Sequence, residues 1–218
     1  MTLSLNSLMK FVNVQEVWAL RWYWYNLHYS QYIKLGVCLF ILLYSQFLAA
    51  GDIGRVAGVY LVDAQQDEIR IGTVTFSSKS AVESDSTAIA FELDDSVFSD
   101  HFLSMRPFRC LTGEKEWFCY LKYPYDLRSI ISSDDLTDLE YQLLFIRKKP
   151  SEFGIDAWNG LYYKLRLEED GSMTGELLEG DLNSLQSPPS EKYAKPVDLG
   201  EFIPADVNAR LYPVIRIY

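Results

Sequence analysis

The chain has 218 residues, of which 49% are hydrophobic and 23% charged, and its formal net charge is −10. An apolar share near one half excludes a disordered or collagen-like chain. An excess of acidic over basic residues, 30 against 20, argues against sequence-independent binding to nucleic acid, which needs clustered positive charge. Three cysteines and two histidines leave too few ligands for a zinc or haem protein. We therefore expect no nucleic-acid partner, no metal and no cofactor.

An uncharged apolar segment divides the chain. Residues 35–51 read LGVCLFILLYSQFLAAG, follow Lys34 and end in small residues. A basic flank, an apolar stretch and a small-residue exit are the parts of a secretory signal peptide. As a helix the segment would be about 25 Å long, slightly short of the hydrocarbon core of a bilayer. The sequence therefore predicts a signal peptide or a membrane anchor over residues 35–51, with a buried core helix as the alternative.

The two sides of this segment differ in charge. Residues 1–50 hold three basic residues and one acidic residue, whereas the remainder holds 17 basic and 29 acidic residues. Because basic flanks stay in the cytoplasm, we expect the acidic body to be exported to the periplasm or cell envelope, and to be membrane-anchored if the segment is retained. We divide the chain into a leader (1–34), the apolar segment (35–51) and a single exported domain (52–218).

The leader is rich in tryptophan and tyrosine and is long for a signal peptide. The interpretation we prefer is a translation start placed too far upstream. An aromatic segment at the membrane interface, beside a retained anchor, is a second interpretation, because Trp and Tyr favour the headgroup level. Ordinary folded core is the third.

Short β-like segments separated by turn residues follow one another along the body. They span residues 56–62, 69–76, 87–93, 160–167, 173–179 and 211–218, with two more around Cys110 and Cys119. Residues 94–104 are ambiguous, and Asp170-Gly171 marks a hairpin turn. Many short strands with turns between them favour an antiparallel arrangement. We therefore predict a mainly β (β-rich α+β) fold, an antiparallel barrel or sandwich of calycin-like type.

Cys110 and Cys119 flank a turn near Gly113 in the sequence RCLTGEKEWFCYL. If the turn pairs residues whose numbers sum to 229, the two cysteines lie directly opposite each other and can form a cross-strand disulfide. Such a bond persists in an oxidising compartment, which supports export. Two buried free thiols are the alternative, and a redox-active pair is disfavoured because the short two-residue spacing is missing.

One amphipathic helix is predicted over residues 134–148. Ser132 and Asp135 form a capping-box-like start, and Pro150 ends the segment. The apolar residues that recur at helical spacing are Leu136, Leu139, Leu143 and Ile146. We expect this helix to cover one end of the sheet. Residues 181–206, which contain four prolines, are expected to form a long irregular connection over the surface.

Catalytic patterns are weak in this sequence. His101 is the single histidine after the apolar segment, and a hydrolase would have to use it with a serine or carboxylate partner. The chain lacks a G-x-S-x-G nucleophile motif and the phosphate-binding glycine motifs. We therefore assign no catalytic residue and expect a binding or structural protein rather than an enzyme.

Two aromatic groups are the candidate binding residues. Trp117 and Tyr120 belong to the first group, and Trp158 and Tyr162 belong to the second. Core and cross-strand packing is the usual role of such residues in a β-rich domain. A pocket for an apolar ligand or a glycan is the functional alternative.

Several strings in the middle of the chain resemble a group of uncharacterised proteobacterial proteins. They are residues 105–111 (MRPFRCL), 123–125 (YPY), 135–145 (DLTDLEYQLLF) and 157–165 (AWNGLYYKL). The resemblance covers roughly residues 105–190 and implies a bacterial source, but it transfers no activity. We expect an exported binding or structural domain of the cell envelope; the alternatives are a membrane-anchored component of an envelope assembly and a hydrolase using His101.

Overall fold

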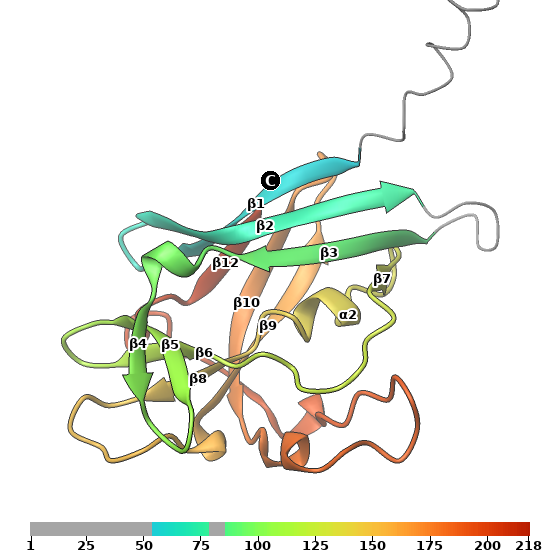
Figure 1. Cartoon of the computed structure of the whole chain (residues 1–218). Helices are drawn as coiled ribbons and strands as arrows, with labels where there is room; N and C mark the ends of the chain where they lie inside the picture. The colour runs from blue at the N-terminus through green and yellow to red at the C-terminus, as the bar shows by residue number, and fades with distance from the viewer. Residues whose placement is uncertain (1–53, 79–85) are drawn as a thin grey trace, which may run out of the picture. The chain divides into compact units, whose positions relative to one another are not determined.

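A computed structural model describes residues 54–78 and 86–218 (Figure 1). The predicted leader (1–34) and apolar segment (35–51) lie outside the described residues. Within the described part, no helix is long and apolar enough to cross a membrane. The strands are β1 (Arg55–Val62), β2 (Glu68–Ser78), β3 (Thr87–Leu93), β4 (Ser99–Phe102), β5 (Pro107–Thr112), β6 (Trp117–Tyr120), β7 (Ile130–Ile131), β8 (Phe145–Lys148), β9 (Gly160–Leu167), β10 (Met173–Gly180), β11 (Ile203–Pro204) and β12 (Val214–Ile217).

These strands form one 12-stranded antiparallel sheet in the order β4-β5-β6-β8-β9-β10-β12-β1-β2-β3-β7, with β11 added on β10. The sheet curls back over itself: the rings of Phe91 on β3 and Tyr120 on β6 lie 6.3 Å apart, although these strands are near opposite ends of the order. β4 and β7 end the sheet without pairing to each other, so the sheet is not closed. The prediction of a mainly β, antiparallel fold is confirmed, and the curvature is that of an open barrel.

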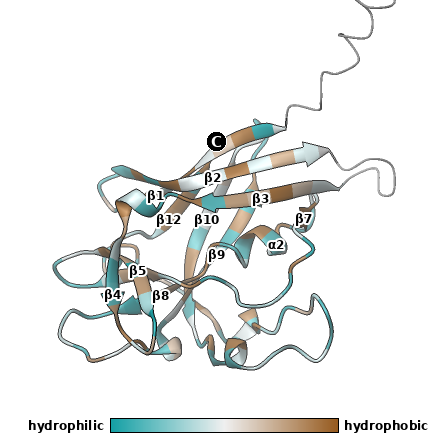
Figure 2. Ribbon diagram, in the orientation of Figure 1, coloured by the Kyte–Doolittle hydropathy of each residue, from teal (hydrophilic) through white to brown (hydrophobic). Residues whose placement is uncertain are grey.

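The inner face of the curl holds the larger hydrophobic core. It draws on nearly every strand and includes Val59, Ile71, Phe118, Tyr163 and Ile215, each with no exposed surface. Side chains alternate between the two faces of a strand, and hydrophobic and hydrophilic bands accordingly alternate along the strands in Figure 2.

A second core lies on the other face of β5, β6, β8 and β9. Cys110, Cys119, Ile146 and Tyr162 belong to it, and Leu182 and Leu185 cover them from the connection of residues 181–206. That connection holds two 3₁₀ turns, η3 (Asn183–Gln186) and η4 (Leu199–Glu201), and the short strand β11. The central strands are therefore buried on both sides.

The cysteine hairpin has the predicted register. Cys110 pairs with Cys119, Leu111 with Phe118 and Thr112 with Trp117, and a disulfide joins the two cysteines. The ambiguous residues 94–104 form a 3₁₀ turn, η1 (Asp95–Val97), followed by β4. The last strand, β12, is shorter than the predicted 211–218.

The prediction of one helix over residues 134–148 is wrong in extent. The α-helix α2 spans only Thr137–Glu140, and the chain then enters β8 at Phe145. β8 pairs with β6 on one side and β9 on the other. Leu143 and Leu144, just before β8, and Phe145 and Ile146 within it are all buried, because this segment runs between the two cores and its side chains alternate between them. Such a run matches a helical period by coincidence.

Candidate functional site

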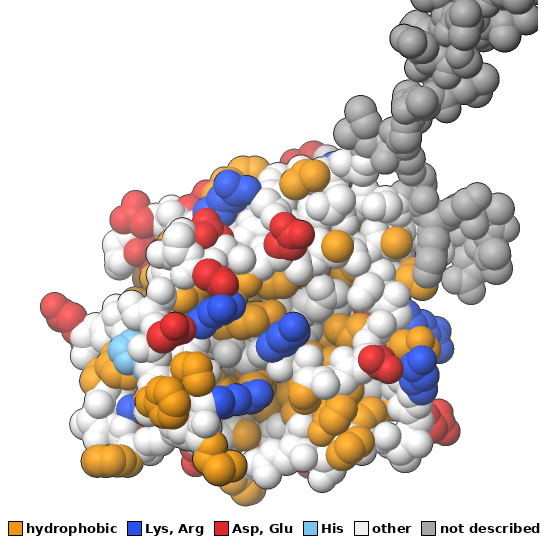
Figure 3. All heavy atoms as spheres, in the orientation of Figure 1, with side chains coloured by type: hydrophobic (Ala, Val, Ile, Leu, Met, Phe, Trp, Pro, Cys, Tyr) orange, Lys and Arg blue, Asp and Glu red, His pale blue; other side chains and the backbone are white. Residues whose placement is uncertain are grey.

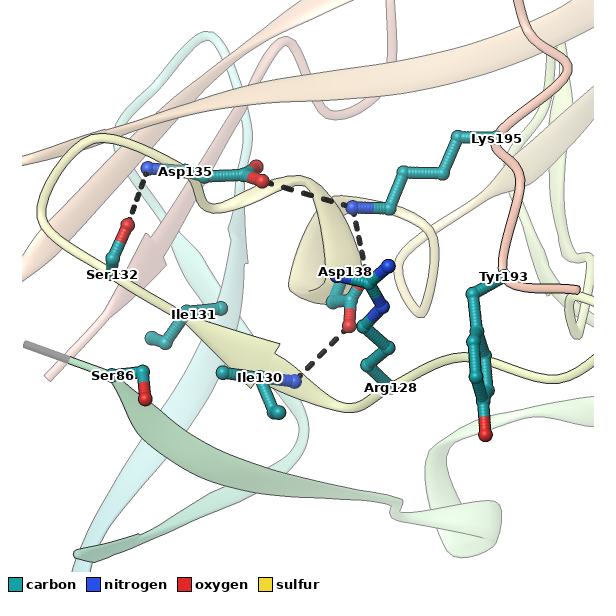
Figure 4. Close-up of a pocket in the computed structure, with 9 residues that line it drawn as sticks. All are labelled: Ser86, Arg128, Ile130, Ile131, Ser132, Asp135, Asp138, Tyr193 and Lys195. Carbon is teal, nitrogen blue, oxygen red and sulfur yellow. Dashed lines mark hydrogen bonds and ion pairs between the residues drawn. The ribbon is translucent and has the colours of Figure 1, made fainter. Parts of the chain in front are cut away.

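A cavity of about 300 Å³ opens beside α2, where the edge of the sheet meets the connection of residues 181–206 (Figure 4). Polar side chains predominate in its lining. The lining residues are Ser86, Arg128, Ile130, Ile131, Ser132, Asp135, Asp138, Tyr193 and Lys195. They come from the β3–β7 edge, the turn before α2, the first turn of α2 and the long connection.

Asp138 forms the buried base of this cavity. Its side chain is 3% exposed, and its carboxylate accepts a hydrogen bond of 3.1 Å from the backbone N–H of Ile130. Lys195 Nζ lies 2.7 Å from the other carboxylate oxygen. An ionised carboxylate that loses water needs such partners, and here the cation and the backbone N–H supply them.

Asp135 lies at the rim and is more exposed. Lys195 Nζ is 3.9 Å from its carboxylate, so this lysine lies between two acidic side chains (Figure 4). The Thr137 side chain and backbone N–H donate hydrogen bonds that lower the pKa of Asp135, and Lys195 lowers it further. Ser132 Oγ accepts from the Asp135 N–H at 3.1 Å, so the predicted capping interaction exists but fixes the turn before α2.

Two buried tyrosines fix the backbone on either side of Lys195. The hydroxyl of Tyr123 donates to the carbonyl of Ala194 at 3.1 Å, and the hydroxyl of Tyr141 accepts from the N–H of Val197 at 2.9 Å. Burial raises the pKa of Tyr141 to about 12 and raises the pKa of Tyr123 as well. These two hydrogen bonds hold the backbone that carries Lys195 in place before any ligand arrives.

One wall of the cavity is formed by Tyr193, from the long connection, and Arg128, from the segment just before β7 (Figure 4). The Arg128 guanidinium lies 5.7 Å from the centre of the Tyr193 ring, which is within the range of a cation–π contact. Tyr193 has a φ of 67° and Ser129, next to Arg128, has a φ of 55°. Left-handed backbone in non-glycine residues costs free energy and clusters at binding sites. A left-handed backbone residue therefore occurs in each of the two segments that form this wall, as is typical of binding sites.

The aromatic residues predicted to bind a ligand do not come together. Trp117 and Tyr120 lie on β6 but on opposite faces of the sheet, packed against different cores. Tyr162 has no exposed surface, and its hydroxyl lies 2.5 Å from a carboxylate oxygen of Glu140. Trp158 is 69% exposed on the 3₁₀ turn η2 (Ala157–Asn159). None of the four lines the cavity beside α2.

His101 lies on β4, away from this cavity. Its ring centre is 4.3 Å from that of Trp117, and its Nε2 is buried with no hydrogen-bond partner among the described residues. Trp117 also contacts Lys148, whose Nζ lies 5.0 Å from the ring centre. Aromatic packing accounts for the position of His101.

The sequence has almost no pattern that marks the residues of this cavity. Asp135 belongs to the predicted helix start and Asp138 to the predicted helix, whereas Arg128, Tyr193 and Lys195 stand in irregular segments without a motif. These residues come together only because the 181–206 connection folds back on α2. Among the residues that the structure describes, no group of three or more His, Cys, Asp or Glu side chains could hold a metal ion.

Comparison of this chain with protein-family models, with curated proteins and with solved structures gave no match.

Proposed function

We propose that this chain is an exported, non-catalytic binding domain of a bacterial cell envelope, and that its ligand occupies the cavity beside α2. The Cys110–Cys119 disulfide supports a location outside the cytoplasm, because cytosolic thiols are kept reduced. The apolar segment 35–51 acts in this proposal as the export signal. The sequence resemblance to proteobacterial proteins supports the bacterial envelope.

The observation that carries the binding proposal is the composition of the cavity. It combines the exposed Asp135 carboxylate with the Arg128 guanidinium and the ring of Tyr193, while the buried Asp138 holds Lys195 at the base. Carboxylates accept hydrogen bonds from hydroxyl groups, guanidinium groups donate several, and an aromatic face packs on apolar C–H groups. A saccharide offers all three complementary features. The ligand class we assign is therefore a small saccharide or the end of a glycan.

The same geometry favours binding over catalysis. Lys195 Nζ is engaged by two carboxylates, and the Asp138 carboxylate is engaged by Lys195 and the Ile130 N–H. Both charged groups at the base of the cavity are thus held by protein partners. Catalysis through His101 would take place elsewhere, against the Trp117 ring.

Calorimetric titration with N-acetylglucosamine oligosaccharides tests this proposal. The wild-type chain should bind in the micromolar to millimolar range, and the variants Arg128→Ala and Tyr193→Ala should each weaken binding about tenfold or more. Arg166→Ala is the matched control, since Arg166 lies on β9 outside the cavity and should leave affinity unchanged. No binding of any oligosaccharide, or equal binding by all four proteins, would contradict the assigned site.

A further inference from the structure

Solvent-exposed apolar side chains project from two loops at one end of the domain. Phe102 and Met105 belong to the β4–β5 hairpin and are 78% and 100% exposed; Phe153 and Trp158 belong to the β8–β9 loop and are 106% and 69% exposed. A Cβ built on Gly154 would lie 3.3 Å from the Leu103 carbonyl oxygen, so the two loops are neighbours. Figure 3 shows hydrophobic side chains gathered at this end, in the lower left of the view.

Other side chains of the same loops anchor them to the domain. Leu103, Ile155 and Ala157 pack against the second core, and Lys148 Nζ donates to the Lys149 carbonyl at 2.9 Å and to the Glu152 carbonyl. The apolar tips therefore stand out from well-supported loops. Single exposed hydrophobic residues are ordinary, but four large ones on adjacent tips mark an interaction surface.

A basic hollow lies on the same hairpin, immediately beside the tips. It has a volume of about 260 Å³ and is lined by Asp100, Arg106, Pro107, Phe108, Arg109, Tyr120 and Lys122. Arg109 is paired with Asp95 at 2.5 Å, and the Arg106 guanidinium lies 5.2 Å from the Phe108 ring centre. Within the described ranges, Arg106 and Lys122 form no ion pair with a carboxylate. Positive charge is thus available at one end of a protein whose net charge is −10.

We propose that these tips insert into an anionic phospholipid bilayer, with a lipid phosphate held by Arg106 and Lys122. Trp and Phe side chains favour the interfacial region of a bilayer, and nearby Lys and Arg side chains add attraction to anionic headgroups. The acidic remainder of the domain is repelled by the same surface, so contact is limited to this end. The domain therefore docks in one orientation.

A bilayer fits this surface better than a protein partner does. The four side chains project singly from two tips, two of them with no shielding at all. A protein interface needs a complementary packed surface around such anchors, whereas the bilayer interface accommodates protruding tips without shape matching.

Oxidation of Met105 by hydrogen peroxide measures this contact in the exported product, residues 52–218, which lacks the apolar segment and can reach a bilayer only through the domain. Vesicles of phosphatidylglycerol should slow the conversion of Met105 to its sulfoxide several-fold, and phosphatidylcholine vesicles should slow it less. Met173, which is 5% exposed, is the internal reference and should react slowly under all conditions. An unchanged Met105 rate with vesicles would overturn the proposal, and equal protection by both lipids would overturn the role given to Arg106 and Lys122.

Substitutions at two exposed positions complete the test of membrane docking. Phe153→Asp places a charge on a tip and should abolish most of the protection, whereas Val207→Asp, at a residue 54% exposed outside these loops, should preserve it. Because both side chains are exposed, the fold should remain intact, as thermal unfolding would check. Equal protection in both variants, or protection by a host protein fraction without any by vesicles, would overturn membrane docking.

Discussion

Lys195 Nζ lies 2.7 Å from the carboxylate of Asp138, and this ion pair ties the connection of residues 181–206 to α2. The same carboxylate accepts a hydrogen bond from Ile130 on β7, so one buried side chain joins β7 and α2 to the distant connection of residues 181–206. The base of the proposed binding cavity is therefore part of what holds the domain together.

Asp138→Ala should destabilise the domain. The substitution leaves the Ile130 N–H and the Lys195 ammonium without their partner, at a cost of about 2–3 kcal/mol in the free energy of unfolding. Asp134→Ala, at an exposed position, should change it by less than about 0.5 kcal/mol. Urea unfolding of both variants measures the difference; equal stabilities would show that the ion pair contributes nothing.

Glu140→Ala should be more damaging. The Glu140 carboxylate, with no exposed surface, accepts from the Tyr162 hydroxyl at 2.5 Å and the Leu165 N–H at 2.8 Å, and Lys164 Nζ lies 3.1 Å away. Its removal leaves two buried donors unpaired, and we expect a loss of about 3–5 kcal/mol. The exposed Glu176→Ala on β10 is the matched control in guanidinium unfolding. A loss below that of Asp138→Ala would contradict this ranking.

Tyr141→Phe should weaken the attachment of the 181–206 connection. The variant loses the hydroxyl that accepts from the Val197 N–H, and we expect a cost of about 1–2 kcal/mol. Backbone hydrogen exchange should accelerate at Val197 while β9 and β10 keep their protection. Unchanged exchange at Val197 would show that this hydrogen bond does not hold the connection.

Stability should also fall at high pH. Burial raises the pKa of Tyr120 and of Tyr141 to about 12, whereas an unfolded tyrosine ionises near pH 10. Between these values the unfolded state releases more protons than the folded state, so the free energy of unfolding decreases as pH rises, by roughly 2 kcal/mol per tyrosine. Tyr120→Phe should show a smaller decrease in urea unfolding from pH 9 to 11. A parallel decrease in both proteins would contradict the assignment to Tyr120.

Loss of the disulfide should destabilise the fold without abolishing it. In the chain-entropy model, opening the loop between Cys110 and Cys119 costs about 2.5–3 kcal/mol. The double variant Cys110→Ala/Cys119→Ala should show this loss in urea unfolding, and the wild-type chain should approach it after reduction. A stability that does not respond to reduction would contradict a structural disulfide.

Local patterns predicted the hairpins well. The register of Cys110 against Cys119 followed from a short turn near Gly113, because a tight turn fixes which residues face each other. The β9–β10 turn formed at Gly171, which has a φ of 80°, as the Asp-Gly pair indicated.

Such local patterns could not predict which distant parts of the chain pack together. Leu143 and Ile146 matched a helical period, yet they belong to different cores on opposite faces of the sheet. Which faces are covered depends on the curl of the sheet and on the 181–206 connection, and neither has a local signal. The cavity was missed for the same reason, since Asp138 and Lys195 meet only after that connection folds back.

The proposal that this domain works outside the cytoplasm is tested most directly by the intact mass of the protein purified from the cells that produce it, measured before and after reduction. The account predicts the mass of residues 52–218, increasing by two hydrogen atoms on reduction as the Cys110–Cys119 bond opens. A product that retains residues 35–51, with a mass unchanged by reduction, would contradict both the signal peptide and the disulfide on which the proposed location depends.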